Sequence, residues 1–151
     1  MVAGVTDNVV WAIGERLLHN YLLPRDCPRV TYYSGPATQE SDRERFFPGT
    51  RARHVVAVEQ AWYPHIRSGR LWRYELPPTG FVEVDPIADY HVSRSAVEPR
   101  SEEIITDILA ALLDRDVELR FLPSLWPLRD QVLASSLHFS FIRMRNAQPR
   151  P

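Results

Sequence analysis

Residues 71–86 read LWRYELPPTGFVEVDP, and this stretch says most about the fold of the chain. Two runs rich in aromatic and β-branched residues, Leu71 to Leu76 and Phe81 to Asp85, flank the sequence Pro77-Pro78-Thr79-Gly80. Such runs on either side of a proline- and glycine-rich segment predict two strands joined by a turn. A third short strand is expected nearby, over Tyr90 to Ser93.

Outward from this stretch, strand-like and helix-like patterns alternate without internal repeats. Apolar runs predict further strands over 9–13, 29–33, 54–59, 117–122 and 139–144. Helical spacing of apolar residues predicts helices over 15–23, 38–47, 62–67, 101–114 and 124–136. The helix over 101–114 is expected to begin at Ser101, because a hydroxyl followed by two glutamates complements the positive end of a helix.

These patterns predict a single α+β domain over residues 1–147, with a mixed, mainly antiparallel sheet core flanked by helices. The strands expected to form this core are 9–13, 54–59, 71–76, 81–85 and 139–143. Helices 101–114 and 124–136 are expected to pack outside it. Residues 148–151, rich in proline and arginine, are expected to be a flexible tail.

The chain contains no lysine, and all 18 of its basic residues are arginine. This excludes chemistry that needs a lysine amine, such as a Schiff base, a pyridoxal phosphate anchor or a Walker-type phosphate lysine. Guanidinium groups remain available, and these bind carboxylates and phosphates through two points. Codon usage in a GC-rich genome is the simpler cause of the bias, but the chemical exclusion holds for either cause.

Charge and hydropathy narrow the class of partner. The formal net charge is −1, which gives no electrostatic reason to expect binding to nucleic acid or to an anionic membrane. A single cysteine, Cys27, excludes an internal disulfide. Neither a signal peptide nor a membrane-spanning stretch is evident. We therefore expect a cytoplasmic protein that binds a small molecule, with its oligomeric state left open.

The stretch 71–86 resembles the central segment of the small rifamycin ADP-ribosyltransferases, in which a strand ends in Glu and a Gly turn leads to Glu-x-Asp-Pro. Glu75, Gly80, Glu83, Asp85 and Pro86 fall on that pattern. The resemblance implies an ADP-ribosyltransferase-like fold and NAD as a substrate. It also implies that Asp85, the aspartate before proline, is the catalytic acid.

The resemblance extends to the residues that would hold NAD. Trp11, in the run Val10 to Ile13, takes the place of the family's aromatic residue on the nicotinamide side, and Ser93-Arg94 echoes a family Ser-Arg pair. The expected NAD-binding residues are Trp11, Arg25, Tyr90, Ser93 and Arg94. The family's His-Gly-Thr motif has no counterpart in the ten residues before Trp11, which implies impaired transfer.

A second resemblance covers more of the chain. Residues 24–29, PRDCPR, and 142–147, IRMRNA, are similar to signatures of an uncharacterised bacterial domain family. That resemblance implies a kinship but no activity.

Asp85 and Glu83 fit the chemistry that the first resemblance implies. When the bond from ribose to nicotinamide breaks, positive charge develops on the sugar, and a carboxylate stabilises it or accepts the acceptor's proton. Glu83 lies two residues before Asp85 on a strand, so it is expected on the same face and in the same site. The alternative is that Asp85 caps the turn beside Pro86.

The rigid loop after Pro24 offers a second set of candidates. Arg25 and Arg29 would suit a pyrophosphate, and Cys27 would act as a nucleophile if His19 or His54 lay close. The alternative is a structural loop that buries Cys27.

The remaining polar candidates are weaker. The histidines have no metal-ligand spacing, so no metal site is expected. His91 is the histidine most worth attention, and the alternative, which ordinary strand patterns favour, is an exposed strand-edge position. Arg143, Arg145 and Asn146 would meet an anionic ligand or form a solvated strand end.

Two function classes remain open. One is an enzyme or former enzyme of the ADP-ribosyltransferase type that binds NAD or an ADP-ribose-like ligand near Trp11 and Asp85. The other is a non-catalytic small-molecule-binding or interaction domain. A cleft that contains Asp85 would favour the first class, and an exposed apolar patch without such a cleft would favour the second.

Overall fold

A four-stranded sheet forms the centre of the molecule. The computed structural model describes residues 8–151, so the expected domain start at residue 1 lies outside the described residues. The strand order is β8-β3-β2-β9, with β2 Arg29–Tyr33, β3 His54–Glu59, β8 Val117–Leu122 and β9 His138–Ile142. β3 and β8 run parallel, whereas β2 pairs antiparallel with both β3 and β9.

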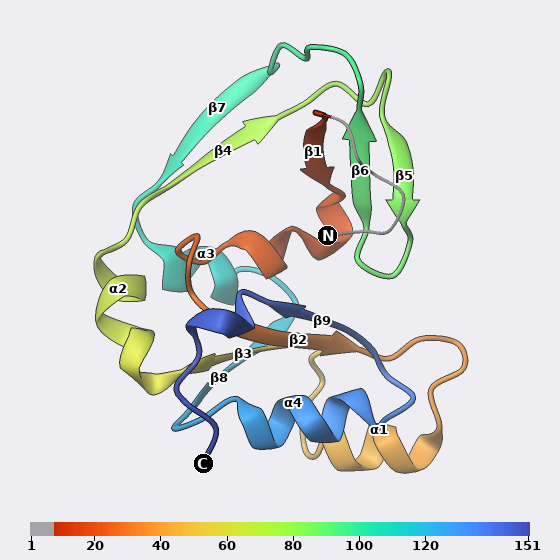
Figure 1. The fold of residues 1–151 in the computed structure, drawn as a ribbon, viewed down its shortest axis with the longest axis vertical. Helices are drawn as coiled ribbons and strands as arrows, with labels where there is room; N and C mark the ends of the chain where they lie inside the picture. Colours follow the sequence, from red (N-terminus) through yellow and green to blue (C-terminus); the bar gives the residue numbers. More distant parts are fainter. Residues whose placement is uncertain (1–7) are drawn as a thin grey trace.

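Helices cover both faces of this sheet (Figure 1). One face packs against α1 Glu40–Phe46 and α4 Trp126–Leu133, and the other packs against α2 Tyr63–Ser68 and α3 Ile108–Leu113. The alternation of β3 explains the two cores, because Val55 and Ala57 enter the first and Val56 and Val58 the second. The 3-10 helices η1 Glu15–Tyr21, η2 Gln60–Trp62 and η3 Met144–Asn146 complete the fold.

Two smaller antiparallel sheets stand away from the central one (Figure 1). The first has the order β1-β6-β5, formed by β1 Val10–Ile13, β6 Tyr90–Ser93 and β5 Val82–Asp85. The second is a two-stranded ribbon of β4 Leu71–Glu75 and β7 Ser101–Ile105. The α+β class and the mainly antiparallel pairing are therefore confirmed, but the expected core strands are divided among three sheets.

The helix predicted over 101–114 is wrong in its first half. Ser101 to Ile105 forms strand β7, which pairs with β4 along its whole length, and only Ile108–Leu113 is helical. The helix cap is Asp107, whose carboxylate Oδ1 accepts the N–H of Ala110 at 2.9 Å. The pairing with β4 overrides the local start signal at Ser101, because a strand partner satisfies the backbone groups of the whole segment.

The chain end is anchored at two residues of the stretch expected to be a flexible tail. The buried carboxylate of Glu59 accepts the N–H of Gln148 at 3.0 Å, and Trp126 Nε1 donates to the Gln148 carbonyl at 2.6 Å. Arg150 pairs with Asp130 at 2.8 Å and stacks over the Trp126 ring. These contacts place the end of the chain beside α4.

The described residues include no helix with the length and apolar character that crossing a bilayer requires.

Candidate functional site

A pocket of about 770 Å³ lies between the small sheet β1-β6-β5 and the edge strand β9 of the central sheet. Segments far apart in the sequence meet there. Its lining residues are Trp11, Ala12, Ile13, Tyr21, Asp85, Ala88, Tyr90, Phe139, Ser140, Phe141 and Arg143. Of the residues assigned from the sequence, Trp11, Asp85 and Tyr90 are brought together in this pocket.

Aromatic side chains form one wall of the pocket. Trp11 is 44% exposed although it sits on a strand, and its ring meets Tyr90 edge-on with centroids 6.1 Å apart. The hydroxyl groups of Tyr21 and Tyr90 form a hydrogen bond with each other. Burial raises the pKa of Tyr90, and the bond to Tyr21 raises it further, so the Tyr90 hydroxyl remains neutral at physiological pH. The wall therefore presents ring faces and hydroxyl groups.

Arg143 brings a positive charge to the pocket. It follows β9 with a left-handed φ of 56°, a conformation that residues with a Cβ adopt only when the surroundings hold them there. Its guanidinium makes no hydrogen bond or ion pair with any residue in 8–151. Burial lowers the pKa of the neighbouring Arg29, and the charge of Arg143 adds to that lowering. An unpaired guanidinium beside aromatic rings is suited to bind an anionic group.

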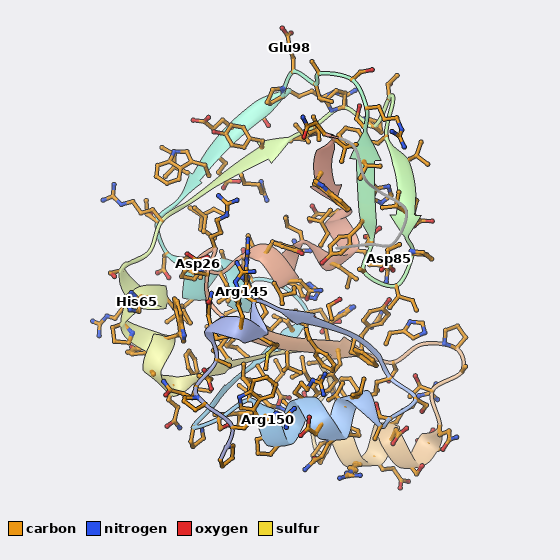
Figure 2. All side chains as sticks on the ribbon, viewed as in Figure 1. Asp26, His65, Asp85, Glu98, Arg145 and Arg150 are labelled. Atoms are coloured by element: carbon orange, nitrogen blue, oxygen red, sulfur yellow. The ribbon has the colours of Figure 1, made fainter. Side chains whose placement is uncertain are left out.

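Asp85 lies at the end of β5 that points toward the central sheet (Figure 2). Its Oδ1 accepts the backbone N–H groups of Ile87 at 3.0 Å and Ala88 at 2.9 Å, which is the turn-capping role expected as the alternative. No residue within the described range donates a hydrogen bond to Oδ2. Asp85 therefore fixes the β5–β6 turn with one oxygen and retains a second acceptor at the pocket.

Glu83 does not lie on the same face as Asp85, contrary to the sequence-based expectation. A β-bulge separates the two residues, so Glu83 stands opposite His91 of β6 and Asp85 stands opposite Tyr90. Adjacent residues of β6 point to opposite faces of the sheet, and their partners do the same. Glu83 consequently lies with His91 on the reverse face and takes no part in the pocket.

Arg25, Ser93 and Arg94 are also absent from the lining of the pocket. Arg25 is exposed on the loop before β2. Ser93 is buried and its hydroxyl donates to the carbonyl of Ser95 at 3.1 Å, while Arg94 is exposed just beyond the end of β6. The positive group that reaches the pocket is Arg143, one of the weaker candidates in the sequence.

The loop around Cys27 has a structural role. Arg29 is 1% exposed and its guanidinium donates to the carbonyls of Asn20, Pro24, Arg25 and Cys27 at 3.0–3.3 Å. These bonds use four of the five N–H donors of the guanidinium, and the burial of Arg29 keeps it out of reach of a pyrophosphate. Cys27 is fully buried, and burial raises the pKa of its thiol to about 11, so it is no thiolate nucleophile.

Tyr21 and Ser140 were not found from the sequence. Tyr21 lies in a helical pattern and Ser140 within an apolar strand, and neither position carries a motif. A signal existed only for Arg143, because an arginine directly after a strand is well placed to reach a strand-end pocket. The other contributions depend on which strand edges face each other.

The described residues thus form an α+β domain with a pocket between two sheets, lined by aromatic rings, an unpaired arginine and a carboxylate. The chain belongs to DUF6886, a family of unknown function whose model matches residues 3–147. Neither the curated proteins nor the solved structures contain a match to the chain.

Proposed function

We propose that this is an ADP-ribosyltransferase-like domain whose pocket binds NAD or an ADP-ribose-like ligand. The observation that carries the proposal is the convergence of Trp11, Asp85, Tyr90 and Arg143 on one pocket. Its volume of about 770 Å³ falls within the range of roughly 300–1,000 Å³ that is usual for small-molecule sites.

Each lining group matches one part of such a ligand. The exposed ring of Trp11 offers a stacking surface for nicotinamide or adenine. Arg143 has no protein partner among the described residues, and its planar guanidinium suits the pyrophosphate. The hydroxyl groups of Tyr21, Tyr90 and Ser140 suit hydrogen bonds to ribose.

Asp85 is the group suited to chemistry. In transfer, the bond between ribose C1 and the nicotinamide nitrogen breaks, and its electron pair leaves with nicotinamide. The carboxylate of Asp85 would stabilise the positive charge that develops on the ribose, while an acceptor hydroxyl attacks C1 and passes its proton to that carboxylate. Stabilisation of a charge that exists only near the transition state would accelerate the reaction.

We expect transfer by this chain to be weak. The pocket lining within the described residues contains no histidine, the residue type that holds the NAD ribose in the transferase family that the chain resembles. Accurate positioning of the reacting groups supplies a large part of enzymatic rate enhancement. Binding is therefore expected to exceed catalysis.

A second candidate function is a non-catalytic small-molecule-binding domain. The observation that favours it is the hydrogen bonding of Asp85, whose Oδ1 is occupied by two backbone N–H groups of its own turn. A residue that is needed for the fold of the turn requires no catalytic role to explain its presence.

The test is titration of the full chain with NAD and with ADP-ribose, read by calorimetry and by the melting temperature. Saturation at 100 times Kd should stabilise the native state by about 2.7 kcal/mol. Trp11→Ala should weaken binding by roughly 5- to 150-fold, given about 1–3 kcal/mol for a lost aromatic stack on a base. Arg143→Gln should weaken NAD and ADP-ribose but not nicotinamide alone.

Matched controls lie outside the pocket. Trp72→Ala removes a tryptophan of similar exposure on β4, and Arg145→Gln removes an exposed arginine two residues after Arg143. Both variants should bind like the natural chain. Absence of binding by either ligand would overturn the proposal, and binding without release of nicotinamide would favour the non-catalytic alternative.

A further inference from the structure

The reverse face of the small sheet, away from the pocket, carries a second polar group formed by Glu83, Asp89 and His91. Each of these residues offers one metal-ligating atom, and the three atoms lie within 4.8 Å of one another. Residues 8–151 contain no second group of His, Cys, Asp and Glu side chains with this geometry. None of the three side chains contributes to the lining of the pocket.

The backbone holds the three residues in place. Glu83 and His91 are direct cross-strand partners of β5 and β6, so their side chains project side by side. Asp89 ends the turn between these strands with a left-handed φ of 59°, and its carbonyl accepts the N–H of Gly14 at 2.9 Å. A Cβ at position 14 would lie 2.1 Å from Asp89 Oδ2, so the carboxylate occupies space that only a glycine leaves open.

The charges of the group favour a cation. Two carboxylates lie close together, and Asp89 is only 8% exposed, which strengthens their repulsion relative to a solvated pair. His91 Nε2 lies 3.0 Å from Asp89 Oδ1, and Arg16 Nε lies 3.8 Å from Asp89 Oδ2. Arg16 also donates to the carbonyl of Pro86 at 2.9 Å, and its charge acts on both Asp89 and Glu83, so it offsets one of the two negative charges.

We propose that Glu83, Asp89 and His91 bind a divalent transition-metal ion, with Zn²⁺ as the best match. One imidazole nitrogen and two carboxylate oxygens suit Zn²⁺, whereas Mg²⁺ and Ca²⁺ prefer oxygen ligands alone. Three protein ligands leave a coordination position for water, as in zinc sites that are not purely structural. Glu83 is exposed, so the ion reaches the site from solvent.

The spacing of the histidines did not indicate this group, because the ligands come from two strands. Asp89 and His91 are two residues apart, but Glu83 joins them only through the β5–β6 register and its bulge. If Asp85 paired with Tyr90 and the hairpin had no bulge, Glu83 would lie opposite Val92, on the same face as Asp85. The group would then lack Glu83.

The test is calorimetric titration of the metal-free full chain, without an affinity tag, with ZnCl₂, and with MgCl₂ and CaCl₂ as comparison ions. One Zn²⁺ per chain should bind, with little heat from Mg²⁺ or Ca²⁺. Glu83→Gln and His91→Ala should each weaken Zn²⁺ binding at least about tenfold, since loss of even an outer partner of a metal ligand costs roughly 10–100-fold. Co²⁺ should give visible absorption bands in the natural chain that both variants lose.

The variants are chosen so that a folding defect is recognised. Glu83 is exposed, so Glu83→Gln should leave the circular dichroism spectrum unchanged. His65→Ala, which removes an exposed histidine on α2 (Figure 2), is the control and should bind Zn²⁺ like the natural chain. Zn²⁺ binding of equal affinity in the natural chain, Glu83→Gln and His91→Ala would overturn the proposal, as would the absence of binding.

Discussion

The four-stranded central sheet and the three-stranded sheet β1-β6-β5 differ in what their side chains contact. In β3, every residue from Val55 to Glu59 is buried, and helices pack against both faces. In β5, Val82 is 64% exposed, and the faces of its sheet carry the pocket on one side and the polar group on the other. Burial of apolar area supplies stability, so the central sheet holds the core of the molecule, whereas the outer sheet leaves its polar groups open to solvent.

The largest expected effect belongs to the core of the central sheet. Leu112 is fully buried in the cluster that α3 forms with β3, whereas its neighbour Leu113 is 68% exposed. Leu112→Ala should lower the free energy of unfolding by about 2–5 kcal/mol. Leu113→Ala should lower it by less than about 1 kcal/mol. Urea denaturation of both variants measures the difference, and equal losses would contradict the placement of the core described above.

The second effect concerns His19, on η1 between the two sheets. Burial, together with the nearby His54, Arg115 and Arg16, lowers the pKa of His19 from 6.5 to about 3. In the unfolded chain His19 binds a proton below about pH 6.5, whereas in the folded chain it binds one only below about pH 3. Stability is therefore complete above pH 6.5 and declines as the pH falls toward 3.

Between pH 7 and pH 4.5 this linkage should cost roughly 2–3 kcal/mol of unfolding free energy. His19→Gln should remove most of the decline, while the exposed-residue variant His65→Gln should retain it. Urea denaturation at the two pH values is the measurement. A decline of the same size in His19→Gln would assign the pH dependence to other groups, such as His54, whose pKa burial also lowers.

The smallest effect on stability is expected in the outer sheet, at Asp85. Asparagine retains an oxygen that accepts the two N–H groups of the turn, so Asp85→Asn should change the free energy of unfolding by less than about 1 kcal/mol. Affinity for NAD should remain nearly unchanged, whereas any residual release of nicotinamide should be lost. Nicotinamide is measured by chromatography, and turnover that persists in Asp85→Asn would place the chemistry on another residue. Asp85→Ala provides the comparison, because it should lose the turn cap as well.

Local patterns were sufficient where one strong preference acts. The run His54 to Glu59 holds four consecutive apolar residues, three of them valine, and Tyr90 to Ser93 and the alternating run Val117 to Leu122 also fit strand patterns, so these strands were predicted with their observed bounds. Local patterns failed at Ser101 to Ile105, where a helix start and a strand are compatible with the same residues. The partner strand β4 decides between them, and it lies 26 residues or more earlier in the chain.

The candidate site follows the same division. Trp11, Asp85 and Tyr90 were assigned from the sequence and do line one pocket, whereas Arg25, Ser93 and Arg94 do not. Glu83 was assigned to the wrong face because a single bulged residue reverses the direction of every side chain before it. No residue type between Glu83 and Asp85 indicates a bulge from the sequence.

The sequence by itself determined the α+β class, the absence of lysine chemistry, most strand positions and the turn at Asp85. These properties depend on composition and on preferences that act within a few residues. Only the tertiary structure decided that the strands divide into three sheets, that Arg143 and Ser140 face Trp11, and that Glu83 joins Asp89 and His91. Such contacts arise from the pairing of distant strand edges, whose register depends on the burial of whole faces and not on the identity of any one residue.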